Sequence, residues 1–232
     1  MIRKLIVTLL TLGTALGLAL SAAPGTVVAH DSSTSKILGS VNVAPGEHLG
    51  DVTTVNGSVN VGSDAVVGHA HTVNGSVHLQ SHGTATDLAT VNGGIHVEEN
   101  SRVTGDVHTV NGGLHIEKSA DVTGDVGNVN GNIKVEFAHV GGSIVTTNGN
   151  LDLGPDARID GDVVMKPNHN DGFHWGRENI PHVLIEPGTV VKGELRFERK
   201  VILYVSDRAT IGPVHGADVQ KFSGDHPPQN WD

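Results

Sequence analysis

Apolar and polar residues alternate over short segments, and these segments recur along the middle of the chain. An Asn-Gly step marks each recurrence, at intervals of 18, 18, 19, 19 and 18 residues. The third and fifth residues after each Asn are apolar and the residue between them is polar, as in Ile95-His96-Val97. This period of two predicts a short strand with one buried face. The repeated asparagines are Asn56, Asn74, Asn92, Asn111, Asn130 and Asn148.

Each repeat holds about three such segments, separated by Gly or Asn. These two residues tolerate the positive φ of tight corners better than others do. A short repeat that persists over so many intervals indicates a solenoid, in which equivalent strands pair in parallel and in register about 4.8 Å apart. The sequence therefore predicts an all-β fold, a single-stranded parallel β-helix (β-solenoid) with about 18–19 residues per coil and roughly nine coils.

The repeated asparagines have a structural interpretation. A side-chain amide both donates and accepts, so each Asn can bond to its copies in the coils above and below, or to the corner backbone. We therefore expect an internal asparagine ladder that runs along the stack. Replacing Asn92 by Leu is expected to destabilise the stack without affecting a ligand.

The same pattern sets the boundaries of the chain's parts. Residues 1–29 combine a basic start, an apolar run and small residues up to Ala29, which predicts a secretory signal peptide. Residues 166–182 lack strand alternation and are longer than a corner requires, which predicts an inserted loop. The other expected parts are a polar lead-in (30–36), regular β-solenoid coils (37–165), C-terminal coils with a cap (183–214) and a flexible polar tail (215–232).

Composition narrows the classes of function. The net charge of −10 argues against nucleic-acid binding, which requires a basic face. The chain has no cysteine, so disulfides and thiol chemistry are excluded. No segment after the signal peptide is long and apolar enough to span a bilayer. Aromatic residues make up only 3% of the chain, so small aliphatic side chains must fill a narrow interior.

Three histidines occupy the same outward position in consecutive repeats: His78, His96 and His115. They are expected to form a stripe with about 4.8 Å between neighbours. Imidazole is a ligand for zinc, copper and nickel, which makes the stripe a candidate site for a divalent metal. Parallel side chains on a flat face point alongside one another, however, and the alternative is a solvated strand face without any cofactor.

A second column lies five residues before each repeated Asn. Stacked carboxylates can hold calcium, or act as an acid pair in glycan cleavage. In several repeats the Asp follows a Gly, which favours a structural role at a corner. The column comprises Asp51, His69, Asp87, Asp106, Asp125 and Ser143.

The loop 166–182 concentrates aromatic, acidic, basic and imidazole side chains. Loops on rigid scaffolds often carry binding residues, so this loop is a candidate contact for a glycan or another partner. The alternative is that its aromatic rings cover the side of the solenoid. The candidate binding residues are His169, Asp171, Phe173, His174, Trp175 and Arg177.

Two segments, 151–163 (LDLGPDARIDGDV) and 183–195 (VLIEPGTVVKGEL), resemble the repeats of bactofilins, a bacterial family of polymer-forming cytoskeletal proteins. The Thr-Val-Asn-Gly repeats also resemble a family of bacterial surface adhesins. Together the resemblances cover about residues 37–212. The resemblance to bactofilins implies a right-handed β-helix that polymerises end to end, and neither resemblance implies catalytic residues.

These observations favour an exported structural or adhesive β-solenoid protein, periplasmic, extracellular or at the cell surface. We expect it to associate with itself or to contact envelope or extracellular polysaccharide, without catalysis. The first alternative is a carbohydrate- or metal-binding module that uses the histidine stripe or the loop 166–182. The second alternative is a polysaccharide lyase or hydrolase.

Overall fold

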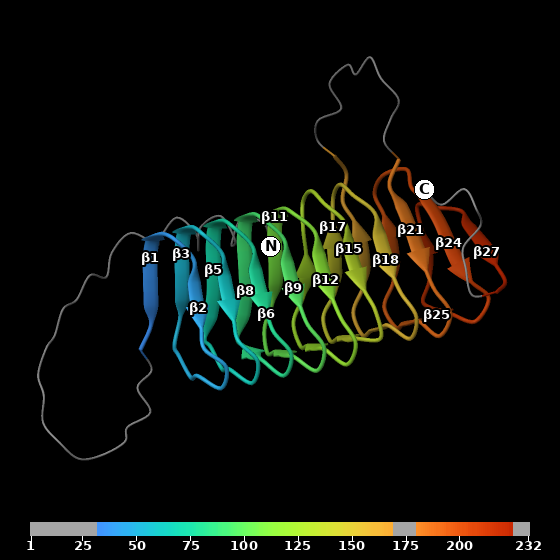
Figure 1. Cartoon of the computed structure of the whole chain (residues 1–232). Coiled ribbons are helices and arrows are strands. Elements are labelled where there is room, and N and C mark those ends of the chain that lie inside the picture. Colours follow the sequence, from blue (N-terminus) through green and yellow to red (C-terminus); the bar gives the residue numbers. More distant parts are fainter. Residues whose placement is uncertain (1–31, 169–179, 225–232) are drawn as a thin grey trace, which may run out of the picture. The chain divides into compact units, whose positions relative to one another are not determined.

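A computed structural model describes residues 32–168 and 180–224 of the chain, and these residues form 27 short strands and their connecting turns. The strands belong to three parallel sheets that run along a stack of coils (Figure 1). The predicted parallel β-solenoid is therefore confirmed. The predicted signal peptide, residues 1–29, lies outside the described residues, and the hand of the coil stays a prediction from the resemblance.

The first sheet contains ten strands, and most of its strands in the early coils end at a repeated asparagine. In stacking order they are β1 (Thr34–Leu38), β3 (Val52–Asn56), β5 (His69–Asn74), β8 (Asp87–Asn92), β11 (Val107–Asn111), β14 (Val126–Gly127), β17 (Ile144–Thr146), β20 (Val163–Met165), β23 (Leu195–Phe197) and β26 (Val214–His215).

The second sheet contains the apolar-polar-apolar segments that follow each Asn-Gly step. Its ten strands are β2 (Val41–Val43), β4 (Val59–Val61), β6 (Val77–Leu79), β9 (Ile95–Val97), β12 (Leu114–Ile116), β15 (Ile133–Val135), β18 (Leu151–Leu153), β21 (His182–Ile185), β24 (Ile202–Ser206) and β27 (Val219–Phe222).

The third sheet is the narrowest, with two residues in each of its seven strands. They are β7 (Thr84–Ala85), β10 (Arg102–Val103), β13 (Asp121–Val122), β16 (His139–Val140), β19 (Arg158–Ile159), β22 (Val190–Val191) and β25 (Thr210–Ile211). Single bridges from His48 to Val66 and from Val66 to Thr84 continue this sheet into the first coils.

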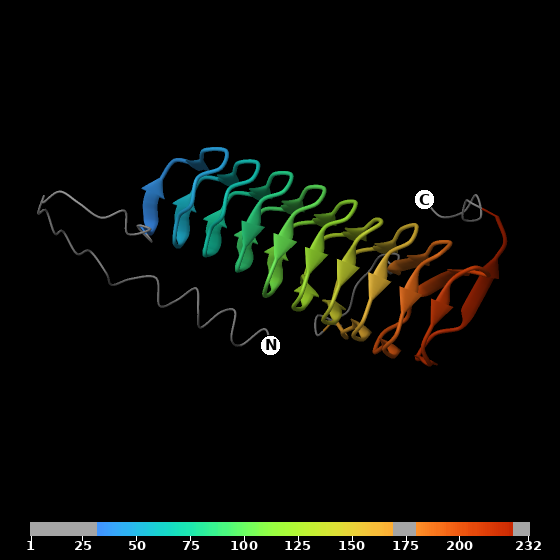
Figure 2. The ribbon, with the colours of Figure 1, turned by 90° about the horizontal axis from the view of Figure 1, so that it is seen from below.

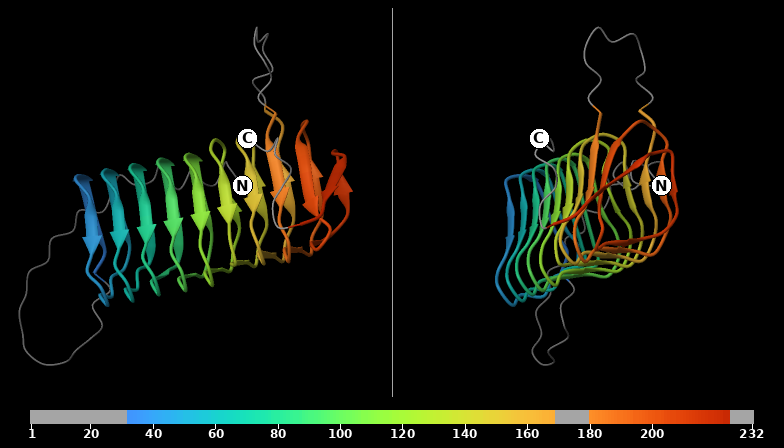
Figure 3. Two further views of the ribbon diagram at one scale, coloured as in Figure 1. Left: turned by 45° about the vertical axis from the view of Figure 1, so that its right-hand side comes forward. Right: turned by 90° about the vertical axis from the view of Figure 1, so that its right-hand side faces the viewer.

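Equivalent residues lie directly over one another from coil to coil. Val77 pairs with Ile95, and Ile95 pairs with Leu114, each in the parallel sense. Figures 2 and 3 show the coils following one another in sequence order along the stack. A one-residue slip would turn every inward side chain outward, so the alternating pattern of the sequence fixes this register.

The stack has ten coils, one more than expected, because strands extend into both segments that the sequence analysis set outside the coils. β1 begins at Thr34, within the expected lead-in 30–36, and pairs with β3. β27 spans Val219–Phe222, within the expected tail 215–232, and pairs with β24. Both segments are polar in composition, but their backbone hydrogen bonds need only a neighbouring coil, whatever the outward side chains are.

The interior is a slender aliphatic column. Each regular coil contributes two buried residues from the second sheet, such as Ile95 and Val97, together with one or two from each of the other sheets. Bulkier side chains appear near the C-terminal end, where Phe197 and Phe222 are buried. Because every coil buries its apolar residues against the next, stacking supplies the burial that a single coil lacks.

The glycine of the Asn-Gly step is required by close approach. A Cβ atom on Gly75 would collide with the carbonyl oxygen of Gly57 in the preceding coil, and a Cβ on Gly93 would meet Gly75 in the same way. The positive φ values lie mainly at another corner, eight residues after most of the repeated asparagines, where a non-glycine residue adopts φ of 50–62°. The residues of this corner are Asp64, His82, Asn100, Ser119, Phe137 and Asp156.

Candidate functional site

The repeated asparagines form a continuous ladder of side-chain hydrogen bonds. The Nδ2 group of each donates to Oδ1 of the Asn in the preceding coil, over distances of 2.8–3.0 Å. The ladder lies on the surface, since five of its six members are exposed: Asn56, Asn74, Asn92, Asn111 and Asn130. The predicted asparagine ladder is therefore present, but its predicted internal location is wrong: the Asn stands at a corner, and its side chain is on the surface.

A column of buried threonines supplies side-chain hydrogen bonds inside the stack. Thr72 and Thr90 are buried and lie two residues before the repeated Asn. Each donates from Oγ1 to the carbonyl oxygen of the glycine one coil back, Gly57 and Gly75, at 2.7 and 2.8 Å. Sequence analysis missed this role, although the signal was present in the recurrence of Thr in Thr-Val-Asn-Gly. The same bond is made by Thr54 and Thr109.

The aspartate column has the geometry expected of corner residues. Oδ1 of Asp87 accepts the backbone N–H of Asp106, and Oδ1 of Asp106 accepts that of Asp125, at 2.7 and 2.8 Å. Asp51 and Asp125 accept the next coil's N–H in the same way, from His69 and Ser143. One oxygen of each carboxylate is thus committed to the backbone of the next corner, which favours the structural interpretation over a calcium site or an acid pair.

The three histidines of the predicted stripe are direct neighbours. His78, His96 and His115 stand at the middle of β6, β9 and β12 and pair in register. The rings of His96 and His115 are stacked, with centroids 5.0 Å apart and planes 5° apart. The ring of His78 meets that of His96 edge-on at 6.1 Å. The stripe is therefore present, but its members are not equivalent.

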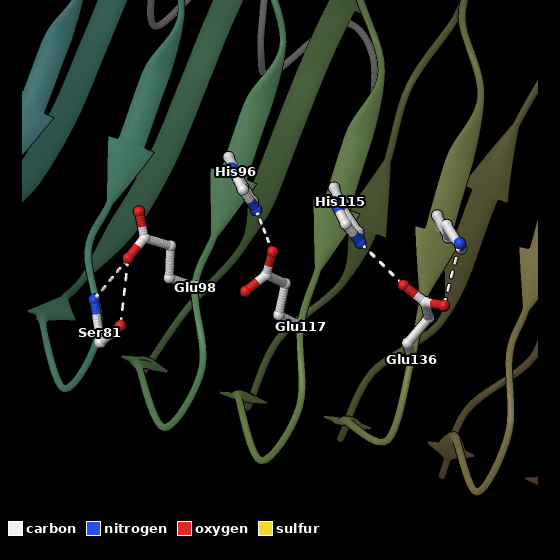
Figure 4. Close-up of polar contacts among 7 residues, drawn as sticks. Ser81, His96, Glu98, His115, Glu117 and Glu136 are labelled. Atoms are coloured by element: carbon white, nitrogen blue, oxygen red, sulfur yellow. Dashed lines mark hydrogen bonds and ion pairs between the residues drawn. The ribbon is translucent and has the colours of Figure 1, made fainter.

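A row of glutamates runs beside the histidine stripe (Figure 4). His96 donates from Nε2 to Oε1 of Glu117 at 2.7 Å, and His115 donates from Nε2 to Oε2 of Glu136 at 3.0 Å. Each glutamate follows a strand of the second sheet by one residue, so it reaches back across one coil toward the preceding histidine. Sequence analysis missed this row, although Glu98, Glu117 and Glu136 occupy equivalent positions in three successive repeats.

His78 lacks the partner that its position predicts. Glu98, the equivalent carboxylate, turns instead to Ser81, whose backbone N–H and hydroxyl both donate to Glu98 Oε2 at 3.1 Å. The polar side chains that come together are therefore His96, His115 and Glu117, whose nitrogen and oxygen atoms lie within 4.8 Å of one another. They are about one-third exposed and open to solvent ions.

Charged side chains continue the stripe toward the C-terminus. Lys134 takes the histidine position in the next coil and contacts Glu136 at 2.9 Å and Asp152 at 4.0 Å. Burial raises the pKa of Glu136, but hydrogen bonds from Lys134 and His115 outweigh it, and the net pKa lies below its usual value. The hydrogen bond to Glu136 raises the pKa of Lys134. This ion pair closes the C-terminal side of the histidine cluster.

A carboxyl pair lies one coil beyond Lys134. Burial, followed by the nearby Asp152 carboxyl group, raises the pKa of Glu186 to about 7. Burial likewise raises the pKa of Asp152, against the opposing attraction of Lys134. The pair therefore holds a proton near neutral pH. It provides a titratable element on the same face as the histidines.

The candidate binding residues His169, Asp171, Phe173, His174, Trp175 and Arg177 all lie outside the described residues. Only the two ends of the loop 166–182 are described, and Lys166 there contacts Glu198 at 3.5 Å. The role of the loop stays a prediction. Within the described residues there is no helix with the length and apolar character needed to cross a membrane.

Searches of protein-family models, curated proteins and solved structures found no match to this chain. The structure supports the β-solenoid that both resemblances imply, whereas membership of the bactofilin or adhesin families stays a prediction.

Proposed function

We propose that this chain is an exported structural protein whose solenoid associates with itself end to end, while its flat polar faces contact polymers of the cell envelope or surface. The proposal assigns no catalytic step. The observation that carries it is the state of the first coil. Ile37 and Leu38 lie at the end of β1, the edge strand of a ten-stranded sheet. Both side chains are apolar, yet each is 75% exposed.

The exposed edge supports association for two reasons. Among the described strands, β1 pairs on one side only, with β3, so its other side presents free backbone donors and acceptors. Exposed apolar side chains at the same place add a hydrophobic contribution when another chain covers them. A pairing strand would satisfy both needs at once.

The opposite end offers a partner of the same geometry. β26 and β27 end the first two sheets, and Val219 on β27 is 37% exposed. Within the described residues neither end is covered by a helix. Because successive coils repeat one register, the terminal coil of a second copy can continue the sheets of the first. A head-to-tail contact of this kind leads to filaments.

The length of the asparagine ladder is consistent with a structural role for the solenoid. The asparagine ladder alone links six coils through side chains, in addition to the backbone bonds between them. We expect such a stack to resist extension along its axis, because backbone and side-chain hydrogen bonds both join successive coils. This property suits a spacer or scaffold better than a flexible recognition module.

The test is the concentration dependence of sedimentation of the purified chain, with electron microscopy of the same samples. We expect filaments or a series of oligomers, and at least a tenfold weaker association for the double variant Ile37→Lys and Leu38→Lys. The matched control is Phe137→Lys, which changes an exposed apolar residue on the side of the stack (45% exposed). A wild-type chain that stays monomeric at about 100 μM would contradict the proposal, and so would equal association of the double variant.

A further inference from the structure

The cluster of His96, His115 and Glu117 combines two imidazoles and one carboxylate on adjacent coils. We propose that these three residues bind one divalent transition-metal ion of the Zn²⁺ type on the outer face of the second sheet. The site is independent of end-to-end association, because it lies in the fourth and fifth coils of the stack, away from both ends.

The donor atoms match the chemistry of zinc. Imidazole nitrogen and carboxylate oxygen are ligands that Zn²⁺ accepts together, usually in four-coordinate sites that protein atoms and water complete. Two nitrogen donors disfavour Ca²⁺ and Mg²⁺, which prefer oxygen. The absence of cysteine in the chain removes competing thiolate sites.

The distances allow closure with small movements. The three ligand atoms lie within 4.8 Å of one another. In a tetrahedral zinc site with bonds of about 2.0–2.2 Å, ligand atoms are about 3.3–3.6 Å apart, so the pair of ligand atoms farthest apart must converge by at most about 1.5 Å. Rotation of partly exposed rings supplies this, since neither ring is locked in the core: their side chains are 33% and 37% exposed.

Glu117 supplies a ligand atom that approaches the histidine rings from beside the stripe, so the donor atoms can converge on one ion. The two histidine rings are parallel, and alone they would point alongside each other. The carboxylate of Glu117 already lies 2.7 Å from the Nε2 atom of His96, at the outer tip of the ring (Figure 4). An ion that replaces the shared proton would move His96 Nε2 and Glu117 Oε1 apart by about 0.6–0.8 Å. It would also draw the His115 ring toward them and away from Glu136.

The neighbours on the same face separate this cluster from the rest of the stripe. His78 has no place in it, because Glu98 is held by Ser81. On the other side, the ammonium group of Lys134 takes the next position and is neutralised by Glu136. The site is thus bounded to two coils, which predicts one ion per chain and not a row of ions.

The repeat itself supplies conservative substitutions. Asn60 occupies the histidine position two coils before His96, and Gln80 occupies the position of Glu117 two coils earlier. The variants His96→Asn, His115→Asn and Glu117→Gln therefore place residues that this fold already accommodates at equivalent positions. His78→Asn is the matched control, since it removes an imidazole from the same stripe outside the cluster.

The experiment is a titration of the purified chain, free of any histidine tag, with Zn²⁺ in competition with a chromophoric chelator. We expect one ion bound at this site, at least tenfold weaker binding in each of the three variants, and unchanged binding in His78→Asn. Cu²⁺ bound to the wild type is expected to show hyperfine coupling to two imidazole nitrogens by electron paramagnetic resonance, and to one in His96→Asn.

Circular dichroism of each variant checks that the fold is retained, and a zinc-dependent rise in melting temperature provides a second readout. The rise is expected in the wild type and in His78→Asn, and is expected to be lost in Glu117→Gln. Zinc binding that is equally tight in all four variants would place the ion elsewhere and overturn the proposal. Absence of binding to the folded wild type at about 1 mM Zn²⁺ would overturn it as well.

Discussion

The guanidinium group of Arg199 donates a hydrogen bond of 2.6 Å from Nη1 to Oδ1 of Asn148, the last member of the asparagine ladder. The same nitrogen donates to the backbone carbonyl of Thr147 at 3.0 Å. Arg199 is 51 residues further along the chain than Asn148. The ladder therefore ends on a charged donor supplied by a later coil, which satisfies an acceptor that no further asparagine reaches.

Replacing Arg199 by Ala is expected to lower the free energy of unfolding by about 1–2 kcal/mol, because two hydrogen bonds from a charged donor are lost from a partly buried position. Urea denaturation followed by circular dichroism measures this. Lys200→Ala is the matched control, since it removes an exposed positive charge one residue away. Equal effects of the two substitutions would show that Arg199 acts through its charge alone.

The ladder predicts a graded response to its own substitutions. Asn92→Ala removes two side-chain hydrogen bonds, one to Asn74 and one to Asn111. Asn56→Ala removes a single bond, the one to Asn74. We expect losses of about 1–2 kcal/mol for Asn92→Ala and about half as much for Asn56→Ala. Equal losses in thermal or urea unfolding would contradict a ladder in which each bond contributes separately.

The alternation of residue types was sufficient to predict the fold, and the residues responsible are those of the second sheet. Val77, Ile95 and Leu114 are apolar at one fixed phase of the repeat, and a parallel stack is the arrangement that buries all of them. The ends were harder to place. The inward and outward residues of β1 and β27 do not alternate clearly, and their pairing depends on the adjacent coil and not on their own pattern.

The candidate site was predicted only in part. Spacing placed His96 and His115 on neighbouring strands, because register follows from the repeat. It did not reveal Glu117, since the side chain that meets His96 lies 21 residues later and approaches from a corner. Nor did it show that Glu98 would be taken by Ser81. Such choices between competing hydrogen-bond donors depend on side-chain geometry, which periodicity does not encode.

The buried threonine column predicts a cost for removing one hydroxyl. Thr90→Val keeps the side-chain shape but leaves the carbonyl oxygen of Gly75 without the Oγ1 donor that lies 2.8 Å away. An acceptor left unsatisfied in the interior is expected to cost about 1–3 kcal/mol. Thr104→Val, at an exposed position, is the control. If unfolding by urea shows no difference between these two variants, the threonine column has no stabilising role.

The carboxyl pair predicts a pH dependence of stability. The pKa of Glu186 is about 7 in the folded chain and near its ordinary value of 4.5 when unfolded. Between these values the folded state holds a proton that the unfolded state has lost, so the contribution of Glu186 to stability is greatest below pH 4.5 and is lost as pH rises to about 7. For a half-buried group screened by solvent, we expect a contribution of about 1–2 kcal/mol.

Glu186→Gln is expected to remove this part of the pH dependence and to make the chain more stable than the wild type at pH 8. Urea unfolding at several values between pH 5 and pH 8 measures the difference. Glu99→Gln, which removes an exposed carboxylate, is the control and is expected to leave the profile unchanged. A wild-type profile reproduced by Glu186→Gln would place the titrating group elsewhere.

The most direct test of the stacked, in-register coil is a set of spin-label distances, which the absence of native cysteine makes simple. Cysteine pairs that join Asn42 to His115, to Asp152 and to Tyr204 place labels on the second sheet four, six and eight coils apart. At about 4.8 Å per coil, the account predicts separations near 19, 29 and 38 Å, rising linearly. Distances that do not increase in this order, or that reach a plateau, would contradict it.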